Sequence, residues 1–410
     1  MHSDVNKTIL KNGLTVISEF VPGVRSVSAG IWIKAGSRNE NAGNMGTAHF
    51  LEHMVFKGTK NRSALKIALA LEESGGHLNA YTSKEQTVFL AQSLDSEINN
   101  TIHVLADLVC NPLLRLRDLK KEKSVILEEI LAVKDTPEDY IFDLFQENLF
   151  PEQSIGFPIL GTKKSILPLK QEDVYNFWQQ FYNAKNIVLS VAGNVDHNQL
   201  LKLAEKNFVF GSSDQSDTYD SVSSSKNLNI DFPEPVNQCH ICMGQEIPGY
   251  ASSMRHAIIA LNTYLGNGMS SRLFQLIREK HGLAYSVFSF LDLFRDAGIF
   301  GFYLGTDLKN KEKAVDILHT EIEKLLQSAL KKNVVDKIKK QLRGNLLLGL
   351  ESTQRRMSRN AKNEIYFNKF ISANETIAEI DEINSQILLE TSQKIFIMDH
   401  FNITSILPYA

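Results

Sequence analysis

The hydrophobic positions along the chain switch between two periods, which predicts a mixture of strands and helices. Short apolar runs on either side of Asn12-Gly13 predict a tight β-hairpin near the start. Alternating or continuous apolar positions predict further strands in the first half over residues 28–34, 78–92 and 187–193. Apolar residues three and four apart predict helices near residues 47–57, 64–74, 97–109, 119–133 and 174–182.

The second half repeats this general order of elements after a polar break. Residues 211–225 are rich in serine and poor in apolar side chains, which is the composition of a linker. Beyond the break, the same patterns predict strands over residues 238–245, from 284 onward and over 298–305, and helices over 254–265, 311–330 and 334–350. We therefore expect an α+β protein with domains at 1–210 and 229–410, joined by a linker at 211–228.

Composition excludes several classes of function. The chain has 410 residues and 43% hydrophobic residues, enough for two packed cores. Its net charge of −3 provides no large basic field for nucleic acid or anionic membrane. It has no apolar run of membrane-spanning length and no basic-then-apolar start typical of a signal peptide, so we expect a cytoplasmic protein.

The three cysteines do not predict a disulfide framework. Cys239 and Cys242 have the CxxC spacing of some metal sites, but their surroundings predict a strand. Residues three apart on a strand point to opposite faces, so these two thiols are not expected to share a metal ion.

The segment His49-Phe50-Leu51-Glu52-His53 carries the strongest chemical signal. On a helix, His49 and His53 share a face, so both rings can bind one metal ion, and Glu52 lies beside them to move a proton. Thr47 is expected to cap this helix, which ends before Gly58. His-x-x-Glu-His is typical of the inverted class of zinc peptidases. The competing interpretation is that both residues are ordinary surface or core histidines.

A hydrolytic zinc site needs a third protein ligand, commonly a carboxylate. In the helix over residues 119–133, Glu128 and Glu129 are the rival candidates. Glu129 falls within the apolar stripe of the helix, where an unpaired charge would be costly, whereas Glu128 has polar neighbours. We predict Glu129 as the ligand and Glu122, two turns earlier, as support for one histidine. The alternative for Glu129 is an ordinary ion pair with a lysine.

These residues resemble the pitrilysin and mitochondrial-processing-peptidase family of zinc peptidases, on its bacterial single-half branch. The resemblance runs from about residue 7 to the end of the chain, and is carried by residues 46–59, 75–83, 125–130, 268–274 and 278–286. It implies two related α+β domains, each a mainly antiparallel sheet packed with helices, together forming one half of a clamshell. The first domain would be catalytic and bind one Zn²⁺ per chain.

The resemblance also implies roles for individual residues. Glu52 would be the general base on the zinc-bound water. Asn79 and Ala80 would lie on an edge strand that pairs with the backbone of a peptide substrate. From the second domain, Arg278 and Tyr285 would bind the substrate carbonyl and the developing oxyanion. Without the resemblance, the Arg-Tyr pair looks like a surface arginine and a core tyrosine.

The acidic pair Asp139 and Asp143 matches positions that receive a substrate arginine in the mitochondrial enzyme, although Asp139 replaces a glutamate there. This predicts a mild preference for basic residues near the cleaved bond.

Longer members of the family join two such two-domain units, so the resemblance implies that this single unit forms a homodimer enclosing a chamber for short or unfolded peptides. Arg278 and Tyr285 could then serve the zinc of their own chain or that of the partner. Two other functions compete with an endopeptidase. One is a non-catalytic peptide-binding or structural subunit of the same fold, which the intact set His49, Glu52, His53 and Glu129 argues against. The other is a zinc hydrolase of small amides, which the predicted substrate strand argues against.

Overall fold

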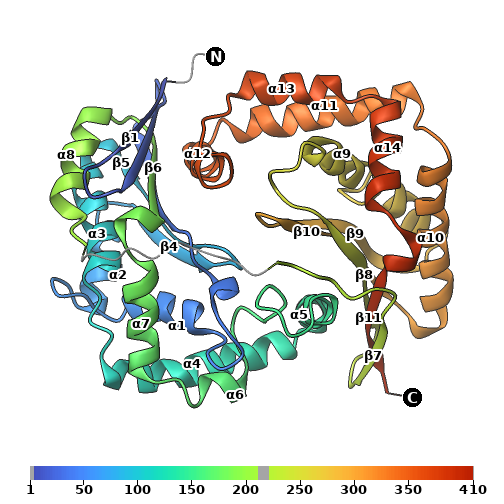
Figure 1. Cartoon of the computed structure of the whole chain (residues 1–410), viewed down its shortest axis with the longest axis horizontal. Coiled ribbons are helices and arrows are strands. Elements are labelled where there is room, and N and C mark those ends of the chain that lie inside the picture. Colours follow the sequence, from blue (N-terminus) through green and yellow to red (C-terminus); the bar gives the residue numbers. More distant parts are fainter. Residues whose placement is uncertain (1–3, 211–220, 410) are drawn as a thin grey trace. The chain divides into compact units, whose positions relative to one another are not determined.

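The computed structural model describes residues 4–210 and 221–409 (Figure 1). The contacts divide the chain into two compact units. The first comprises Met1–Leu131, Phe157–Asp220 and Leu348–Ser372, and the second comprises Ala132–Gly156, Ser221–Leu347 and Ala373–Ala410. Each unit therefore includes a segment from the other half of the chain. The predicted division into domains 1–210 and 229–410 at a single linker does not include this exchange of segments. Of the predicted linker, residues 211–220 lie outside the described residues.

The first unit is built on a six-stranded sheet with the order β1-β2-β6-β3-β5-β4. Its strands are β1 (Asp4–Ile9), β2 (Thr15–Phe20), β3 (Ser26–Ile33), β4 (His77–Thr82), β5 (Thr87–Leu94) and β6 (Ile187–Gly193). All neighbours are antiparallel except β2 and β6. The predicted hairpin is confirmed, because β1 and β2 pair on either side of Asn12-Gly13. The strand β4 lies at one edge of the sheet and pairs only with β5.

Helices cover both faces of this sheet. One face packs on helices from the first half of the chain, namely α1 (Thr47–Val55), α2 (Ala64–Glu72), α3 (Ile98–Cys110), α4 (Leu116–Lys134), α6 (Lys163–Ile166), α7 (Gln171–Phe181) and α8 (His197–Asn207). The other face packs on α12 (Thr353–Phe367). The alternation of β3 separates the two layers, because Ile31 faces the first set and Trp32 packs with Met357 of α12.

The second unit has a five-stranded sheet with the order β7-β11-β8-β10-β9. Its strands are β7 (Asn229–Glu234), β8 (Cys239–Pro248), β9 (Ala284–Leu293), β10 (Ala297–Thr306) and β11 (Asn402–Pro408). If the strands of each unit are numbered by their order along the chain, this order matches β2-β6-β3-β5-β4 of the first sheet. The parallel pair β7-β11 then corresponds to the parallel pair β2-β6. The two units therefore share a topology, as expected for related domains, and each sheet is mainly antiparallel and packed with helices.

The helix layers of the second unit follow the same plan. One face packs on α9 (Arg255–Leu265), a π-helix (Phe274–Lys280), α10 (Lys311–Gln327), α11 (Lys332–Gly349), α13 (Ala373–Glu382) and α14 (Ser385–Ile395), and the other face packs on α5 (Pro137–Leu149). Thus α5 and α12 are exchanged between the two halves of the chain. Cys239 and Cys242 lie in the cores on opposite faces of β8, which confirms that they do not share a site.

Short 3₁₀ turns complete the described elements, at Ser37–Asn39, Asp95–Glu97, Ala184–Asn186, Leu308–Asn310 and Met398–His400. The prediction of one strand over residues 78–92 is wrong, because a turn at residues 83–86 divides it into β4 and β5. Within residues 4–210 and 221–409, no helix combines the length and apolar character that crossing a bilayer requires.

Candidate metal centre

The helix α1 presents the His-x-x-Glu-His segment, and its start is fixed by the carboxyl group of Glu40 from a preceding loop. Gly46 adopts φ +88°, a left-handed conformation that favours glycine, and α1 begins at the next residue. Both carboxylate oxygens of the buried Glu40 accept backbone hydrogen bonds, from Gly46 at 2.7 Å and from Ala48 at 2.6 Å. The predicted cap by Thr47 is therefore wrong. Thr47 is the first helical residue and donates its hydroxyl to the Asn44 carbonyl.

Glu40 fills the role that a capping side chain usually plays, because the first amides of a helix lack partners within the helix. Burial raises the pKa of Glu40 to about 8, although its two backbone hydrogen bonds act in the opposite direction. The carboxyl group thus anchors the first turn of α1, where His49 lies.

Three potential ligands converge between α1 and α4, which lie near one another in the first unit (Figure 1). The Nε2 atom of His49 lies 3.8 Å from one oxygen of Glu129, and the Nε2 atom of His53 lies 3.6 Å from the other. One ligand atom from each of the three residues lies within 4.8 Å of the other two. Among the described residues, this is the one group of three or more His, Cys, Asp or Glu side chains with such spacing.

The donor set and its spacing fit a zinc ion. Zinc bonds of about 2.1 Å place tetrahedral ligand atoms about 3.4 Å apart, close to the 3.8 Å and 3.6 Å between the histidine nitrogens and the Glu129 oxygens. Burial, with a smaller contribution from His53, lowers the pKa of His49 to about 3, so its ring is neutral at physiological pH and has the protonation state that a metal binds. Two imidazoles and one carboxylate are a common set in hydrolytic zinc sites, with the fourth position left for water.

Glu122 lies behind His53 on α4. Its Oε2 atom is 3.2 Å from His53 Nδ1, and its Oε1 atom forms an ion pair with Lys57 Nζ at 2.9 Å. The side chain of Glu122 is only 6% exposed, whereas that of Glu129 is 40% exposed. A carboxylate that accepts a hydrogen bond from Nδ1–H leaves the lone pair of Nε2 free to bind a metal ion, and it fixes the ring orientation.

Glu52 contacts β4 and interacts electrostatically with His53 and Glu129. It is 9% exposed, and its Oε2 atom accepts a hydrogen bond from the Thr82 hydroxyl at 2.5 Å. Burial raises the pKa of Glu52, and the neighbouring Glu129 adds to this effect. A carboxylate with a raised pKa beside a metal site is suited to accept and return a proton.

Asn79 and Ala80 lie on β4, at the edge of the first sheet. The side chains of Leu78 and Ala80 pack toward the core beneath the sheet, and Asn79 is exposed. The Ala80 backbone amide donates to the Asn79 side-chain oxygen at 2.9 Å. An edge strand in contact with α1 offers backbone groups to an extended peptide close to the three converging ligands.

The remaining predicted residues belong to the second unit. Arg278, on the π-helix, stacks between Tyr285 and Phe274, with its guanidinium carbon 4.7 Å and 4.8 Å from the two ring centroids. Tyr285 is the second residue of β9 and is 76% exposed, so it is not the core residue that the pattern alone favours. Asp139 and Asp143 lie on α5. Within the first unit, the structure brings together His49, Glu52, His53, Glu122, Glu129 and β4.

Sequence reasoning missed three residues around this centre: Glu40, Lys57 and Thr82. Thr82 follows the Asn79-Ala80 pair at alternate spacing, which is a signal for a shared face with Ala80. Glu40 and Lys57 carry no local signal for their partners, because their contacts depend on the tertiary fold.

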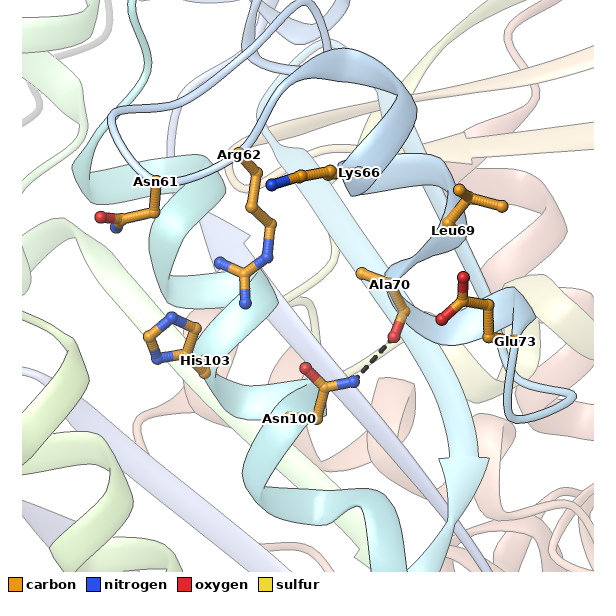
Figure 2. A pocket seen from close by; sticks show the side chains of 8 residues that line it. All are labelled: Asn61, Arg62, Lys66, Leu69, Ala70, Glu73, Asn100 and His103. Atoms are coloured by element: carbon orange, nitrogen blue, oxygen red, sulfur yellow. Dashed lines mark hydrogen bonds between the residues drawn. The ribbon is translucent and has the colours of Figure 1, made fainter.

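A separate pocket of about 640 Å³ lies between α2 and α3 (Figure 2). It is lined by Asn61, Arg62, Lys66, Leu69, Ala70, Glu73, Asn100 and His103. Its polar groups mainly tie the two helices together, since Arg62 forms an ion pair with the buried Asp107 and Asn100 donates to the Ala70 carbonyl. None of the predicted site residues lines this pocket.

The fold and the converging ligands define a two-unit α+β protein with a candidate zinc centre of the peptidase type. Comparison with known families identifies it further. Residues 15–163 match the model for insulinase (peptidase family M16), and residues 168–342 match the model for the peptidase M16 inactive domain. The chain belongs to peptidase family M16.

Relatives over nearly the whole chain agree. An uncharacterized zinc protease of Mycobacterium leprae is 36% identical over 385 residues, covering 92% of this chain and 86% of that protein. An uncharacterized zinc protease of Bacillus subtilis is 34% identical over 406 residues, covering 97% of both. The crystal structure of a protease from Helicobacter pylori superimposes with a TM-score of 0.92 at 22% identity, covering 99% of this chain and 100% of that one, which shows the same fold.

Proposed function

We propose that this protein is a zinc-dependent endopeptidase that hydrolyses short or unfolded polypeptides. The observation that carries the proposal is the convergence of His49, His53 and Glu129 beside the buried carboxylate of Glu52. Family membership and the names of the relatives support the same chemistry. The name of the second family model does not argue against it, because residues 168–342 contain none of these four residues.

His49, His53 and Glu129 would hold the zinc ion, with Glu122 fixing the ring of His53. When bound, zinc supplies Lewis-acid polarisation of the scissile carbonyl and lowers the pKa of a water molecule. Glu52 accepts a proton from the attacking water and donates it to the leaving amine, a pair of steps that its raised pKa favours. The free edge of β4, with Asn79 and Ala80, holds the substrate backbone as an added strand.

The proposal extends to residues of the second unit and to a partner. Arg278 and Tyr285 would bind the substrate carbonyl and its developing negative charge, since the exposed phenol and guanidinium lie against one another. Asp139 and Asp143 would favour basic residues near the cleaved bond. Two copies of the chain would form a homodimer, with one zinc ion in each.

The test is cleavage of a quenched, unstructured peptide by zinc-loaded wild type and Glu52→Gln side by side. We expect wild type to cleave and Glu52→Gln to lose at least 100-fold in kcat while still binding zinc, because removing a positioned proton-transfer group typically costs 10²- to 10⁴-fold. Glu128→Gln is the matched control, since Glu128 is exposed on the same helix as Glu129. Absence of cleavage by the zinc-loaded wild type across a varied set of peptides would contradict the proposal.

A further inference from the structure

The hydroxyl of Thr82 makes the one hydrogen bond that the Glu52 carboxylate forms with described residues. The 2.5 Å distance is at the short end for a hydroxyl that donates to a charged oxygen, where such bonds are strongest. Glu52 is nearly buried, so water does not readily replace this partner. The orientation of the proposed general base therefore depends on one hydroxyl group.

Thr82 is also the last residue of the proposed substrate strand. On β4, the side chains of Leu78, Ala80 and Thr82 are the partly buried ones, and those between them are exposed. The pleat that turns Ala80 toward the core thus turns Thr82 toward α1. A peptide that pairs with β4 would act on the strand that holds the Glu52 partner.

The chain beyond Thr82 is held firmly by the loop after β3. Gly36 lies so close that an added Cβ atom would come within 2.1 Å of the Ser83 carbonyl oxygen. The backbone amides of Ser37 and Arg38 donate to the carbonyls of residues 83 and 84, at 3.1 Å and 2.7 Å.

A buried ion pair between Arg38 and Glu85, at 2.6 Å, adds a side-chain contact between the same loop and this turn. The turn at residues 83–86 is therefore fixed by the loop after β3, whereas β4 itself pairs in the sheet only with β5.

We propose that Thr82 is a positioning residue that links the substrate strand to the general base, its hydroxyl holding the Glu52 carboxylate in the orientation that proton transfer requires. The proposal rests on the endopeptidase function above. In it, Thr82 does not touch the reacting atoms. If Thr82 only satisfies a buried polar group, its loss would affect stability and leave kcat unchanged.

Two substitutions separate these roles. Thr82→Val keeps the shape of the side chain and removes the hydroxyl, and Thr82→Ser keeps the hydroxyl. We expect Thr82→Val to lower kcat by about 10- to 100-fold, as small misplacements of catalytic groups do, with KM changed less than about threefold. We expect Thr82→Ser to restore most of kcat. Zinc content should remain one ion per chain in both, because neither change touches a ligand.

Thr8→Val is the matched control. Thr8 lies on β1, at the other edge of the same sheet, and its hydroxyl bonds to His197 Nε2 at 2.8 Å. The same chemical change there removes a partly buried hydrogen bond far along the sheet from Glu52, and should leave kcat unchanged.

Each outcome has a distinct meaning. Wild-type kcat in Thr82→Val, with Glu52→Gln inactive, would overturn the positioning role and leave the endopeptidase function standing. If Thr82→Ser lost as much kcat as Thr82→Val, the positioning role would also be overturned. The same would follow if the control Thr8→Val lost as much kcat as Thr82→Val. Absence of cleavage by zinc-loaded wild type would defeat the proposed function first.

Discussion

Glu122 offers a quantitative test of the metal centre, because it contacts a proposed ligand without being one. Its carboxylate is almost fully buried and accepts from two groups, His53 Nδ1 at 3.2 Å and Lys57 Nζ at 2.9 Å. Replacing it with alanine removes the group that fixes the His53 tautomer and leaves the Lys57 ammonium without its partner. The perturbation therefore acts on the ligand ring and leaves all three ligands in place.

The expected magnitude follows from the role of such residues. Loss of a carboxylate behind a metal-bound histidine typically weakens metal affinity by about 10- to 100-fold, which is about 1.4–2.7 kcal/mol. Glu122→Gln keeps an oxygen that can accept from Nδ1 but loses the charge, so we expect it near the lower end of this range. Glu122→Ala loses both and should lie near the upper end.

The assay is a competition titration, in which a chromophoric chelator and the apoprotein compete for zinc at pH 7.5. Glu128→Gln again provides the control, since it is an exposed glutamate on the same helix, and it should keep the wild-type Kd. Zinc affinity of Glu122→Ala equal to that of wild type would refute the argument that Glu122 orients His53. A loss equal to that of His53→Ala would show instead that Glu122 is itself a ligand.

Other expectations follow from the same structure. Glu40 keeps its proton in the folded state up to a pKa of about 8, against an ordinary 4.5, so its stabilising contribution is complete below pH 4.5, falls by at most about 1.4 kcal/mol per pH unit above that, and is lost as pH rises through 8. Denaturant midpoints should therefore fall from pH 5 to 8 and level off by pH 9 in wild type, and Glu40→Gln should lack this fall. Arg356 pairs with the buried Glu19 at 2.5 Å, so Arg356→Leu should lower the free energy of unfolding by about 3 kcal/mol in urea denaturation, and the exposed neighbouring Arg355→Leu should not. If Asp139 and Asp143 receive a basic side chain, Asp139→Asn with Asp143→Asn should remove a preference for arginine-containing peptides in paired kcat/KM measurements; equal cleavage of both peptide types by wild type would dismiss that role.

The sequence predicts the metal helix and the ligand helix well, because each has a clear apolar stripe. Glu129 lies opposite both histidines, but its side chain is 40% exposed, so the burial that favoured it over Glu128 is not what places it there. The strand β4 was also predictable in part, from the alternating positions within residues 78–92. Local patterns of this kind depend only on the period of the element.

Features that depend on distant contacts were not predictable. The turn at residues 83–86 contains no glycine or proline, and its shape comes from Gly36 and the buried Arg38–Glu85 pair. The cap of α1 is Glu40, seven residues before the helix starts, whereas local rules favour Thr47.

The exchange of α5 and α12 between the two halves was likewise not predictable from the sequence. The helical period shows which side of a helix is apolar, but it does not show which sheet that side covers. Only the packed structure shows that Met357 of α12 lies against Trp32 of β3.

The most direct test of the account is the zinc X-ray absorption spectrum of the protein loaded with one equivalent of zinc, together with its metal content. The account predicts one ion per chain, with a coordination shell of two imidazole nitrogens and the remaining ligands oxygen, and loss of the stoichiometric ion in His49→Ala. A shell containing sulfur from Cys110, Cys239 or Cys242, or an unchanged spectrum in His49→Ala, would contradict it.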